Sequence, residues 1–326
     1  METSTMPRAS AAQRSHALSL RPRGMGSLRW QRFVRLLVPY LFVLPFVLLF
    51  LAFFLLPFAS SFWQSLYTQY SSGLGLGPPT VEWYGLQNYV KALHDPAFWD
   101  SLKRVLIFGA VQIPIEMLLA LLLAFLMDSA LIRLRRFFRL AFFIPYAVPI
   151  VVATIMWGFF YSPSFSPIAQ SFIALHLPAP DFLGTNTVLW SIANISTWEF
   201  TGYNMVIFFS ALQAIPQEIY EAGRLDGLSE TGIALRLKLP LIRPALLLGV
   251  LFALIGTLQL FNEPKILTGL SHAITTTYTP NLLAYNVAFV QTDYYYGGAI
   301  AVILGVITFI FSFGFMRLTR RQSGGL

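Results

Sequence analysis

Long apolar stretches separated by short polar segments make up most of this sequence. A helix crosses a bilayer core about 30 Å thick with roughly 20 apolar residues. Six stretches reach that length with at most one charged residue each, the third beginning at Phe137 or Leu140. The predicted spans are residues 36–62, 105–127, 137–161, 187–212, 241–262 and 296–316. The pattern therefore predicts an all-α membrane protein with six transmembrane helices.

The composition excludes an ordinary soluble enzyme. Hydrophobic residues make up 56% of the chain and charged residues 11%, whereas a soluble domain carries roughly 25% charged residues. The sequence has no cysteine, which excludes disulfides, thiolate metal sites and cysteine nucleophiles. His94, His176 and His272 lack the spacing of metal ligands, so we expect no metal site. The first apolar stretch is too long for a signal peptide and lacks a small-residue cleavage site, so we expect a retained helix.

The basic residues are distributed unevenly between the two sides of the predicted membrane. Loops rich in Lys and Arg stay on the cytoplasmic side. Of the 22 basic residues, 18 lie in the N-terminal tail, in the loops after spans two and four, or after span six. Both termini are therefore predicted to be cytoplasmic, and the net charge of +8 reflects topology and indicates no nucleic-acid partner. The expected parts are a basic tail (1–35), a permease domain (36–316) with a cytoplasmic loop (214–243), and a C-terminal tail (317–326).

The predicted outer loops contain turn signals and aromatic residues. Residues 73–79 are rich in Gly and Pro and predict a turn. Asp95 and Pro96 predict the start of a short surface helix, because Pro is favoured in a first helical turn. These loops either contact a soluble partner outside the cell or simply connect spans, with aromatic side chains at the membrane interface.

The cytoplasmic loop between spans four and five contains signals for two short helices. Pro216 marks the start of the first, and Glu218 in its first turn suits the positive end of the helix dipole. Gly227 ends this helix at a position that favours positive φ. Ser229 caps the second helix and Pro240 closes it. Ala222 and Gly223 would let the backbone of another protein approach closely; a helix lying on lipid is the alternative.

The same loop resembles a known motif. Glu221-Ala222-Gly223, then Gly227 after three residues and Leu237-Lys238-Leu239-Pro240 after nine more, is similar to the Glu-Ala-Ala…Gly…Ile-x-Leu-Pro motif of bacterial ABC importer permeases. Gly replaces the second Ala, and Leu replaces Ile. Further similarity to the carbohydrate branch lies at residues 197–204, 215–227, 261–263, 85–89 and 95–99. The resemblance implies a type I ABC importer permease fold.

The resemblance also implies how the chain works and with which partners. In that family the loop is a coupling helix that docks onto a cytoplasmic ATPase, and the spans then rock to change the side to which a central cavity opens. The residues implied in coupling are Glu221, Ala222, Gly223, Asp226, Gly227, Leu239 and Pro240. The chain has no phosphate-binding G-x-x-x-x-G-K-[ST] segment, so we expect it to bind no cofactor, with ATP and Mg²⁺ held by a separate ATPase. The implied partners are a second homologous permease, two ATPase subunits, an external solute-binding protein, a carbohydrate and the lipid bilayer.

Candidate carbohydrate-binding residues lie in span four and at the outer end of span five. Sugars are bound by planar hydrogen-bonding side chains and aromatic faces, and a charge inside a span is costly enough to indicate function. The candidates are Trp198, Glu199, Tyr203, Asn204, Gln259, Asn262 and Glu263. Interface aromatics and helix-to-helix hydrogen bonds are the alternative interpretations. We expect Glu116 to bond a backbone N–H or a neighbouring helix instead of a ligand.

Two other classes of membrane protein compete with an importer permease. An ion-coupled secondary transporter would use Glu116 and Glu199 as proton carriers, but no inverted repeat is visible. A sensor or membrane enzyme would need a catalytic cluster, and neither H-E-x-x-H nor G-x-S-x-G occurs. Within the importer class, glycerol-phosphate or another small polar solute is the alternative substrate, although spans four and five contain no Lys or Arg near their outer ends before Lys265. The sequence thus predicts a transport subunit of the bacterial cytoplasmic membrane without naming the sugar.

Overall fold

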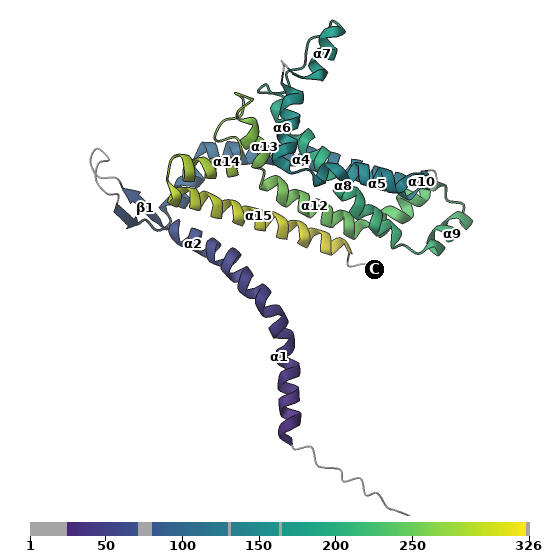
Figure 1. Cartoon of the computed structure of the whole chain (residues 1–326), viewed down its shortest axis with the longest axis horizontal. Coiled ribbons are helices and arrows are strands. Elements are labelled where there is room, and N and C mark those ends of the chain that lie inside the picture. Colours follow the sequence, from purple (N-terminus) through teal and green to yellow (C-terminus); the bar gives the residue numbers. More distant parts are fainter. Residues whose placement is uncertain (1–24, 71–79, 130–131, 163–164, 324–326) are drawn as a thin grey trace, which may run out of the picture. The chain divides into compact units, whose positions relative to one another are not determined.

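A computed structural model describes residues 25–70, 80–129, 132–162 and 165–323, with side chains described from residue 37 to residue 319 in these ranges (Figure 1). The chain divides into two compact units, residues 1–58 and 59–326.

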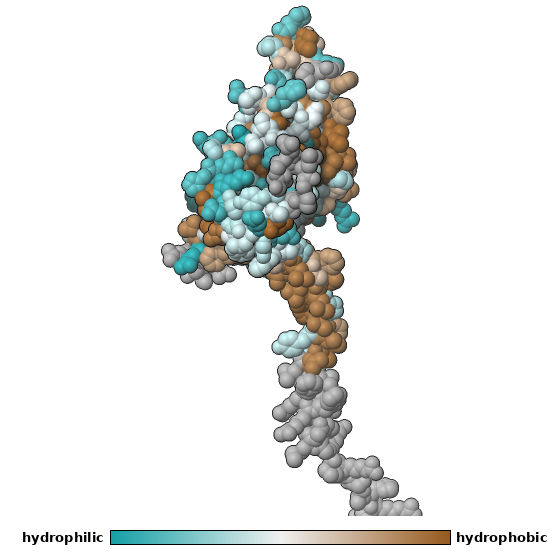
Figure 2. Space-filling view, turned by 90° about the vertical axis from the view of Figure 1, so that its left-hand side faces the viewer, coloured by the Kyte–Doolittle hydropathy of each residue, from teal (hydrophilic) through white to brown (hydrophobic). Residues whose placement is uncertain are grey.

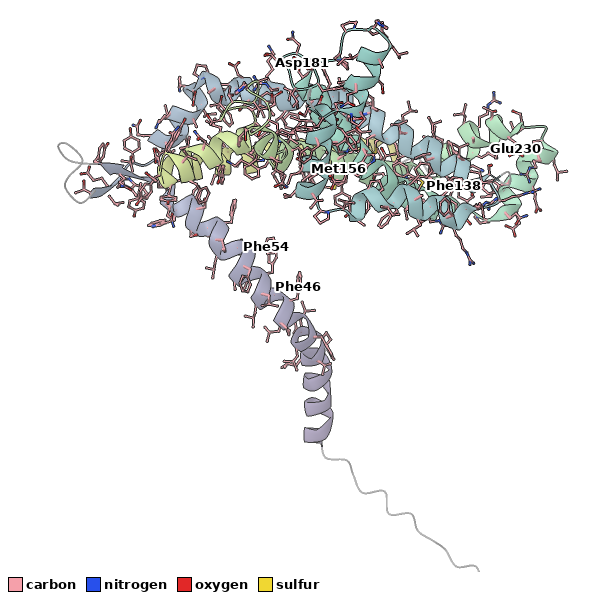
Figure 3. The ribbon with its side chains drawn as sticks, turned by 45° about the horizontal axis from the view of Figure 1, so that its top comes forward. Phe46, Phe54, Phe138, Met156, Asp181 and Glu230 are labelled. Carbon is pink, nitrogen blue, oxygen red and sulfur yellow. The ribbon has the colours of Figure 1, made fainter. Side chains whose placement is uncertain are left out.

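The described part of the first unit is one long apolar helix. It comprises α1 (Met25–Phe50), a π-helical segment η1 (Leu51–Leu55) and the start of α2 (Leu56–Gln64). All the described side chains of this unit are exposed, and hydrophobic side chains cover the helix (Figure 2). Phe46 and Phe54 project from it with 68% and 70% of their surfaces exposed (Figure 3). Because such a surface is stable in hydrocarbon but not in water, the segment Leu37–Gln64 fits the predicted first span.

In the second unit, the end of α2 is followed by a hairpin that the sequence did not predict. Strands β1 (Tyr67–Tyr70) and β2 (Thr80–Trp83) pair antiparallel, with Tyr67 opposite Trp83. The predicted turn at residues 73–79 lies outside the described residues. Helix α3 (Gln87–His94) follows the hairpin.

Helix α4 (Pro96–Asp128) contains the predicted second span and is 33 residues long. The side chain of Asp95 caps it by accepting a hydrogen bond from the Ala97 backbone N–H at 2.9 Å. The prediction of a separate short surface helix at Asp95 and Pro96 is therefore wrong. The cap and the proline do start a helix, but nothing after them ends it before the membrane span begins.

The predicted third span is bent instead of straight. Helices α5 (Arg135–Ala147) and α6 (Ile150–Tyr161) meet at an angle of 94°. Pro145 and Pro149 flank the break, and proline removes backbone hydrogen bonds that would continue a helix. A short helix, α7 (Pro167–Ala174), follows.

Helix α8 (Val188–Gln213) covers the predicted fourth span, but its hydropathy is too low for it to count among the apolar spans. Residues such as Asn194, Glu199 and Asn204 lower that hydropathy. Half of the helix is nevertheless buried, mainly against α4 and α5. A helix that is surrounded by protein tolerates polar residues that lipid would not.

The remaining spans lie near the C-terminus. Helices α12 (Arg243–Leu258) and α13 (Asn262–Leu267) together form one apolar segment, and α15 (Tyr294–Ser323) contains another. Helix α14 (Pro280–Tyr285) and π-helical η3 (Asn286–Val290) connect them. Within the described residues four segments are long and apolar enough to cross a membrane, or five if the bent pair counts as one. An all-α membrane fold is therefore confirmed apart from the hairpin, while the count of six spans stays a prediction.

Helix α4 is central to the second unit, because it contributes to each of its three buried apolar clusters. Phe108 packs with residues of α6, α8 and α13. Leu102 and Val105 pack with α14 and α15. Met117 and Ala120 pack with α8 and with Ile242 at the start of α12. The cores thus fix α8 and α12 against one face of α4, where the polar residues described next gather.

Candidate functional site

A cavity of about 440 Å³ lies between α4, α8, α12 and the break between α5 and α6. Six of the seven predicted carbohydrate-binding residues line it: Glu199, Tyr203, Asn204, Gln259, Asn262 and Glu263. Residues from spans four and five, far apart in the sequence, therefore face one space. Trp198 does not line it; its ring packs edge-on against Trp157 at 5.8 Å between centroids.

Glu116 lies at the wall of this cavity and joins two helices. Its carboxylate accepts a hydrogen bond from Gln112 Nε2 at 2.5 Å and another from Asn204 Nδ2 on α8 at 2.6 Å. The residue is 2% exposed. As expected, Glu116 bonds a neighbouring helix, and both its oxygens have a partner within the chain.

Two further carboxylates line the cavity and have fewer hydrogen-bond partners than Glu116. Glu263 accepts a hydrogen bond from Ser196 Oγ at 3.0 Å. Glu199 is 6% exposed, and its buried Oε2 has no hydrogen-bond partner among the described residues. A buried carboxylate oxygen without a hydrogen-bond partner is energetically costly. A ligand hydroxyl that donates to it would remove this cost and so favour ligand binding.

An aromatic pair forms another part of the wall. The rings of Tyr146 and Tyr203 are stacked, with centroids 4.4 Å apart and an angle of 23° between the planes. Gly202 makes this contact possible, since a Cβ there would lie 1.7 Å from the Phe142 carbonyl oxygen of α5. Tyr146 and Thr257 were not predicted as site residues. The prolines flanking Tyr146 were the only signal that its backbone turns here.

A second cavity adjoins the first. Its volume is about 720 Å³, and Gln259, Phe261 and Asn262 line both spaces. Asn281, Tyr285 and Tyr294 contribute further polar and aromatic groups to the second cavity. The short segment between α12 and α13 thus lines both spaces, and only the first of them has carboxylates in its lining.

The loop between α8 and α12 has the two helices predicted for it. Helix α9 (Gln217–Leu225) ends at Gly227, whose φ is +80°. The Leu228 N–H donates to the Gly223 carbonyl at 3.0 Å, and the Gly227 N–H donates to that of Arg224 at 3.0 Å, which is the Schellman arrangement. Ser229 then caps α10 (Glu230–Ile233) by accepting from the Gly232 N–H at 3.2 Å.

The second loop helix does not end at Pro240. It continues through a π-helical segment η2 (Ala234–Lys238) into α11 (Leu239–Leu241), so Pro240 lies inside it. The wider π turn before Pro240 accommodates the missing proline N–H. Leu239 is half-buried, and Pro240 is exposed.

The predicted coupling residues do not all face outward. Glu221, Ala222, Asp226 and Gly227 are exposed. Gly223 is buried, and a Cβ there would lie 2.6 Å from Leu237 Cδ1, so its predicted exposure to another protein is wrong. The missing side chain instead lets the two helices of the loop pack together. The most exposed apolar side chain of the loop is Leu225, at 89%.

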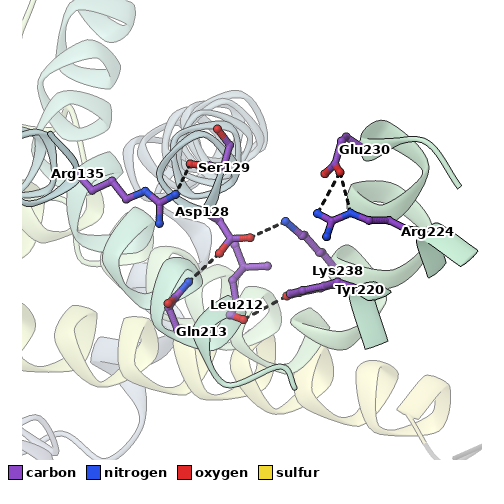
Figure 4. A network of polar contacts seen from close by, with 9 residues as sticks. All are labelled: Asp128, Ser129, Arg135, Leu212, Gln213, Tyr220, Arg224, Glu230 and Lys238. Atoms are coloured by element: carbon purple, nitrogen blue, oxygen red, sulfur yellow. Dashed lines mark hydrogen bonds and ion pairs between the residues drawn. The ribbon is translucent and has the colours of Figure 1, made fainter. Parts of the chain in front are cut away.

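A polar network attaches the loop to the ends of α4 and α8 (Figure 4). Lys238 Nζ lies 2.5 Å from Asp128 Oδ2, and Gln213 Nε2 donates to Asp128 Oδ1 at 2.7 Å. The Tyr220 hydroxyl donates to the Leu212 carbonyl at 3.3 Å. Burial, and secondarily the negative charge of Asp128, raises the pKa of Tyr220, which keeps the phenol in the form that donates.

Comparisons with known proteins agree with this arrangement. The permease YurN of Bacillus subtilis, described as a probable ABC transporter permease, is 31% identical over 280 residues, covering 85% of this chain and 94% of that protein. The lactose transport system permease protein LacF of Rhizobium radiobacter is 30% identical over 279 residues, covering 84% and 91%. A chain of a bacterial ABC transporter that imports the acidic polysaccharide alginate has the same fold, with a TM-score of 0.76 at 18% identity over 90% of this chain and 98% of that one.

The family model described as binding-protein-dependent transport system inner membrane component matches residues 116–323. This range contains the first cavity's carboxylates and the whole loop between α8 and α12. The chain therefore belongs to the family of inner membrane components of binding-protein-dependent transport systems.

Proposed function

We propose that this chain is a permease subunit of an ATP-driven importer that moves a sugar or oligosaccharide across the cytoplasmic membrane. The observation that carries this proposal is the first cavity, where carboxylate, amide and aromatic side chains of α8 and the α12–α13 segment converge. Such a lining suits a polyol, because hydroxyls donate to carboxylates and C–H faces pack on tyrosine rings. The lactose transport permease among the relatives supports a carbohydrate.

The charge of the lining favours a solute without phosphate. Glu116, Glu199 and Glu263 are among the lining residues, and none of the residues given for this cavity is Lys or Arg. A phosphorylated solute would meet three acidic groups without a basic partner in this subunit, which disfavours glycerol-phosphate on electrostatic grounds.

Transport requires partners that supply energy and deliver the solute. We propose that the chain pairs with a second homologous permease and works with two ATPase subunits and an external solute-binding protein. ATP and Mg²⁺ would bind the ATPase, since this sequence lacks the phosphate-binding glycine loop. The chain would then act as a transport subunit and not as an enzyme.

The coupling contact with the ATPase is proposed for the outer face of α9 and the turn after it. Glu221, Ala222, Asp226 and Gly227 are exposed there, beside the exposed Leu225. Gly223, Leu239 and Pro240 would contribute by shaping the loop. When two ATPase subunits close on ATP, these loops would move together, and the attached helices would change the side to which the cavity opens.

This arrangement requires the loop to face the cytoplasm. With the basic residues on that side, both termini would be cytoplasmic, with the tail of residues 1–35, the permease domain of residues 36–316 and the tail of residues 317–326 as the parts of the chain. The basic tail would then lie beside anionic lipid.

The test is ATP-dependent uptake in proteoliposomes containing the assembled transporter and its binding protein. We expect uptake of a sugar, competition by neutral sugars, and no competition by sugar phosphates. Glu199→Gln and Tyr203→Ala should each reduce uptake, because they change groups that line the cavity. Trp198→Phe is the matched control on the same helix, since Trp198 lies outside the cavity. Uptake that continues without ATP or the ATPase would instead favour an ion-coupled transporter.

A further inference from the structure

Two polar links join α4 to α8 at different heights. Asn204 donates to Glu116 at 2.6 Å beside the cavity, and Gln213 donates to Asp128 at 2.7 Å where both helices end. Met117, Ala120, Ala124 and Met127 fill the space along α4 between them, packed against α8. Since both ends of the contact are bonded and its middle is close-packed, α4 and α8 form one rigid pair over this length.

The loop contacts this pair through the buried Lys238–Asp128 ion pair, in addition to the hydrogen bond from Tyr220 to the Leu212 carbonyl. Lys238, the last residue of η2, contacts Asp128, the last residue of α4, with 14% and 8% of their side-chain surfaces exposed. By contrast, Arg224 and Glu230 within the loop pair at 3.1 Å but are 55% and 73% exposed. Exposed pairs are screened by water and contribute little, whereas a buried charge that loses its partner is strongly unfavourable.

The position of the pair adds to its importance. Asp128 lies at the C-terminal end of α4, where the helix dipole disfavours a negative charge. The positive charge of Lys238 offsets both the burial of the Asp128 carboxylate and the unfavourable helix dipole. Its ammonium also lies 4.9 Å from the centre of the Tyr220 ring of α9. One lysine therefore contacts α4 and α9 at once.

We propose that the Asp128–Lys238 ion pair is the joint through which movement of the loop reaches the cavity. This inference rests on the proposed function and deepens it by assigning positioning residues to coupling. Glu116 and Asp128 lie on the same helix, roughly 18 Å apart at 1.5 Å per residue. A displacement of the loop is thus passed by Lys238 to α4, and by the rigid pair to the residues that line the cavity.

The first test measures how firmly the loop is held against α4, and it does not require transport. Because the chain has no cysteine, Leu126→Cys on α4 and Leu235→Cys on η2 give two unique label sites, both exposed and outside the network. Spin-label distances are then measured in the full chain in lipid nanodiscs. We expect a narrow distribution that broadens in Asp128→Asn and in Lys238→Gln. Lys238→Arg, which keeps the charge, should retain the narrow distribution.

The second test reads coupling in the assembled transporter. Uptake per ATP hydrolysed should fall about tenfold in the two neutralising variants, within the usual range of coupling between sites, while ATP hydrolysis continues. Asp293→Asn is the control; it weakens the exposed Lys91–Asp293 pair, 3.9 Å apart between α3 and the residue before α15, and should change neither readout.

The double variant Asp128→Lys with Lys238→Asp exchanges the two charges, and it keeps the test interpretable if the single variants misfold. If the single variants fail to fold and the exchange restores folding with a narrow distribution, the pairing is supported. The proposal is overturned if the neutralising variants keep both the narrow distribution and full coupling, or if they fail to fold and the exchange does not restore folding. If the wild-type transporter imports no sugar, the proposed function fails, while the distance measurement still decides the joint.

Discussion

Glu116 shows how one side chain determines which polar groups remain available for a ligand. Its carboxylate accepts hydrogen bonds from the side-chain amides of Gln112 and Asn204, so these amides have partners within the chain itself. Glu199, which also lines the cavity, has no such donor for its Oε2 among the described residues. Two glutamates in one cavity therefore differ, since one joins helices and the other has an oxygen without a partner, which we propose as a contact for the solute.

Replacing Glu116 tests the first of these roles. Glu116→Leu would remove the acceptor of the buried Gln112 amide and leave Asn204 Nδ2 with only the Phe200 carbonyl at 3.3 Å, and we expect a loss of about 1–3 kcal/mol in the free energy of unfolding. The measurement is thermal unfolding of the chain in nanodiscs. Glu116→Gln is the control, because it keeps one acceptor oxygen and should cost less. Equal stability of Glu116→Leu and wild type would contradict the structural role.

Among the features of the secondary structure, the ends of the loop helices are those that the sequence predicted best. Pro216, Gly227 and Ser229 act on their own neighbours, so the start and end of α9 and the cap of α10 follow from local chemistry. The hairpin of β1 and β2 was missed, because its pairing joins residues across a segment with no strand signal. The Asp128–Lys238 pair joins residues 110 positions apart, and no local pattern shows such a contact.

The direction in which Gly223 faces was also not predictable. A small residue on an amphipathic helix suits both an outer contact and close packing inside, and only the position of Leu237 decides between them. Six of the cavity residues were predictable as a set, because polar residues inside apolar spans are rare. Tyr146 was not, since its place depends on the packing of α5 against Gly202.

The end of α9 is open to a direct test. A Cβ at Gly227 would meet no atom within 4 Å, so Gly227→Ala changes only the backbone energy at positive φ. We expect a cost of about 1–2 kcal/mol, seen as faster hydrogen exchange in α9 and weaker coupling of ATP hydrolysis to uptake. Gly232→Ala in α10 is the matched control, because its φ is not in the left-handed region and its Cβ would make ordinary contacts at 3.5 Å. Similar exchange rates in the two variants would refute this account of the turn.

At the scale of the whole molecule, the orientation in the membrane is the main prediction still to be tested. The absence of cysteine allows single labelling sites at Leu177→Cys, in a predicted outer loop, and Leu225→Cys, in the cytoplasmic loop. These positions are 50% and 89% exposed. An impermeant maleimide applied to intact cells should label position 177 and not position 225. Both should react after permeabilisation when the chain is expressed without the ATPase, which would otherwise cover position 225, and labelling of position 225 in intact cells would reverse the topology.

The length of α4 has a consequence for how the two sides of the membrane communicate. Its 33 residues extend roughly 50 Å, whereas the hydrocarbon core is about 30 Å thick. The helix must therefore tilt or protrude, and its ends reach both aqueous phases. In the proposed assembly, a binding protein outside would contact one end of this helix, and an ATPase inside would act on the other end through the Asp128–Lys238 pair. Between these ends, a movement would cross the membrane along one continuous helix.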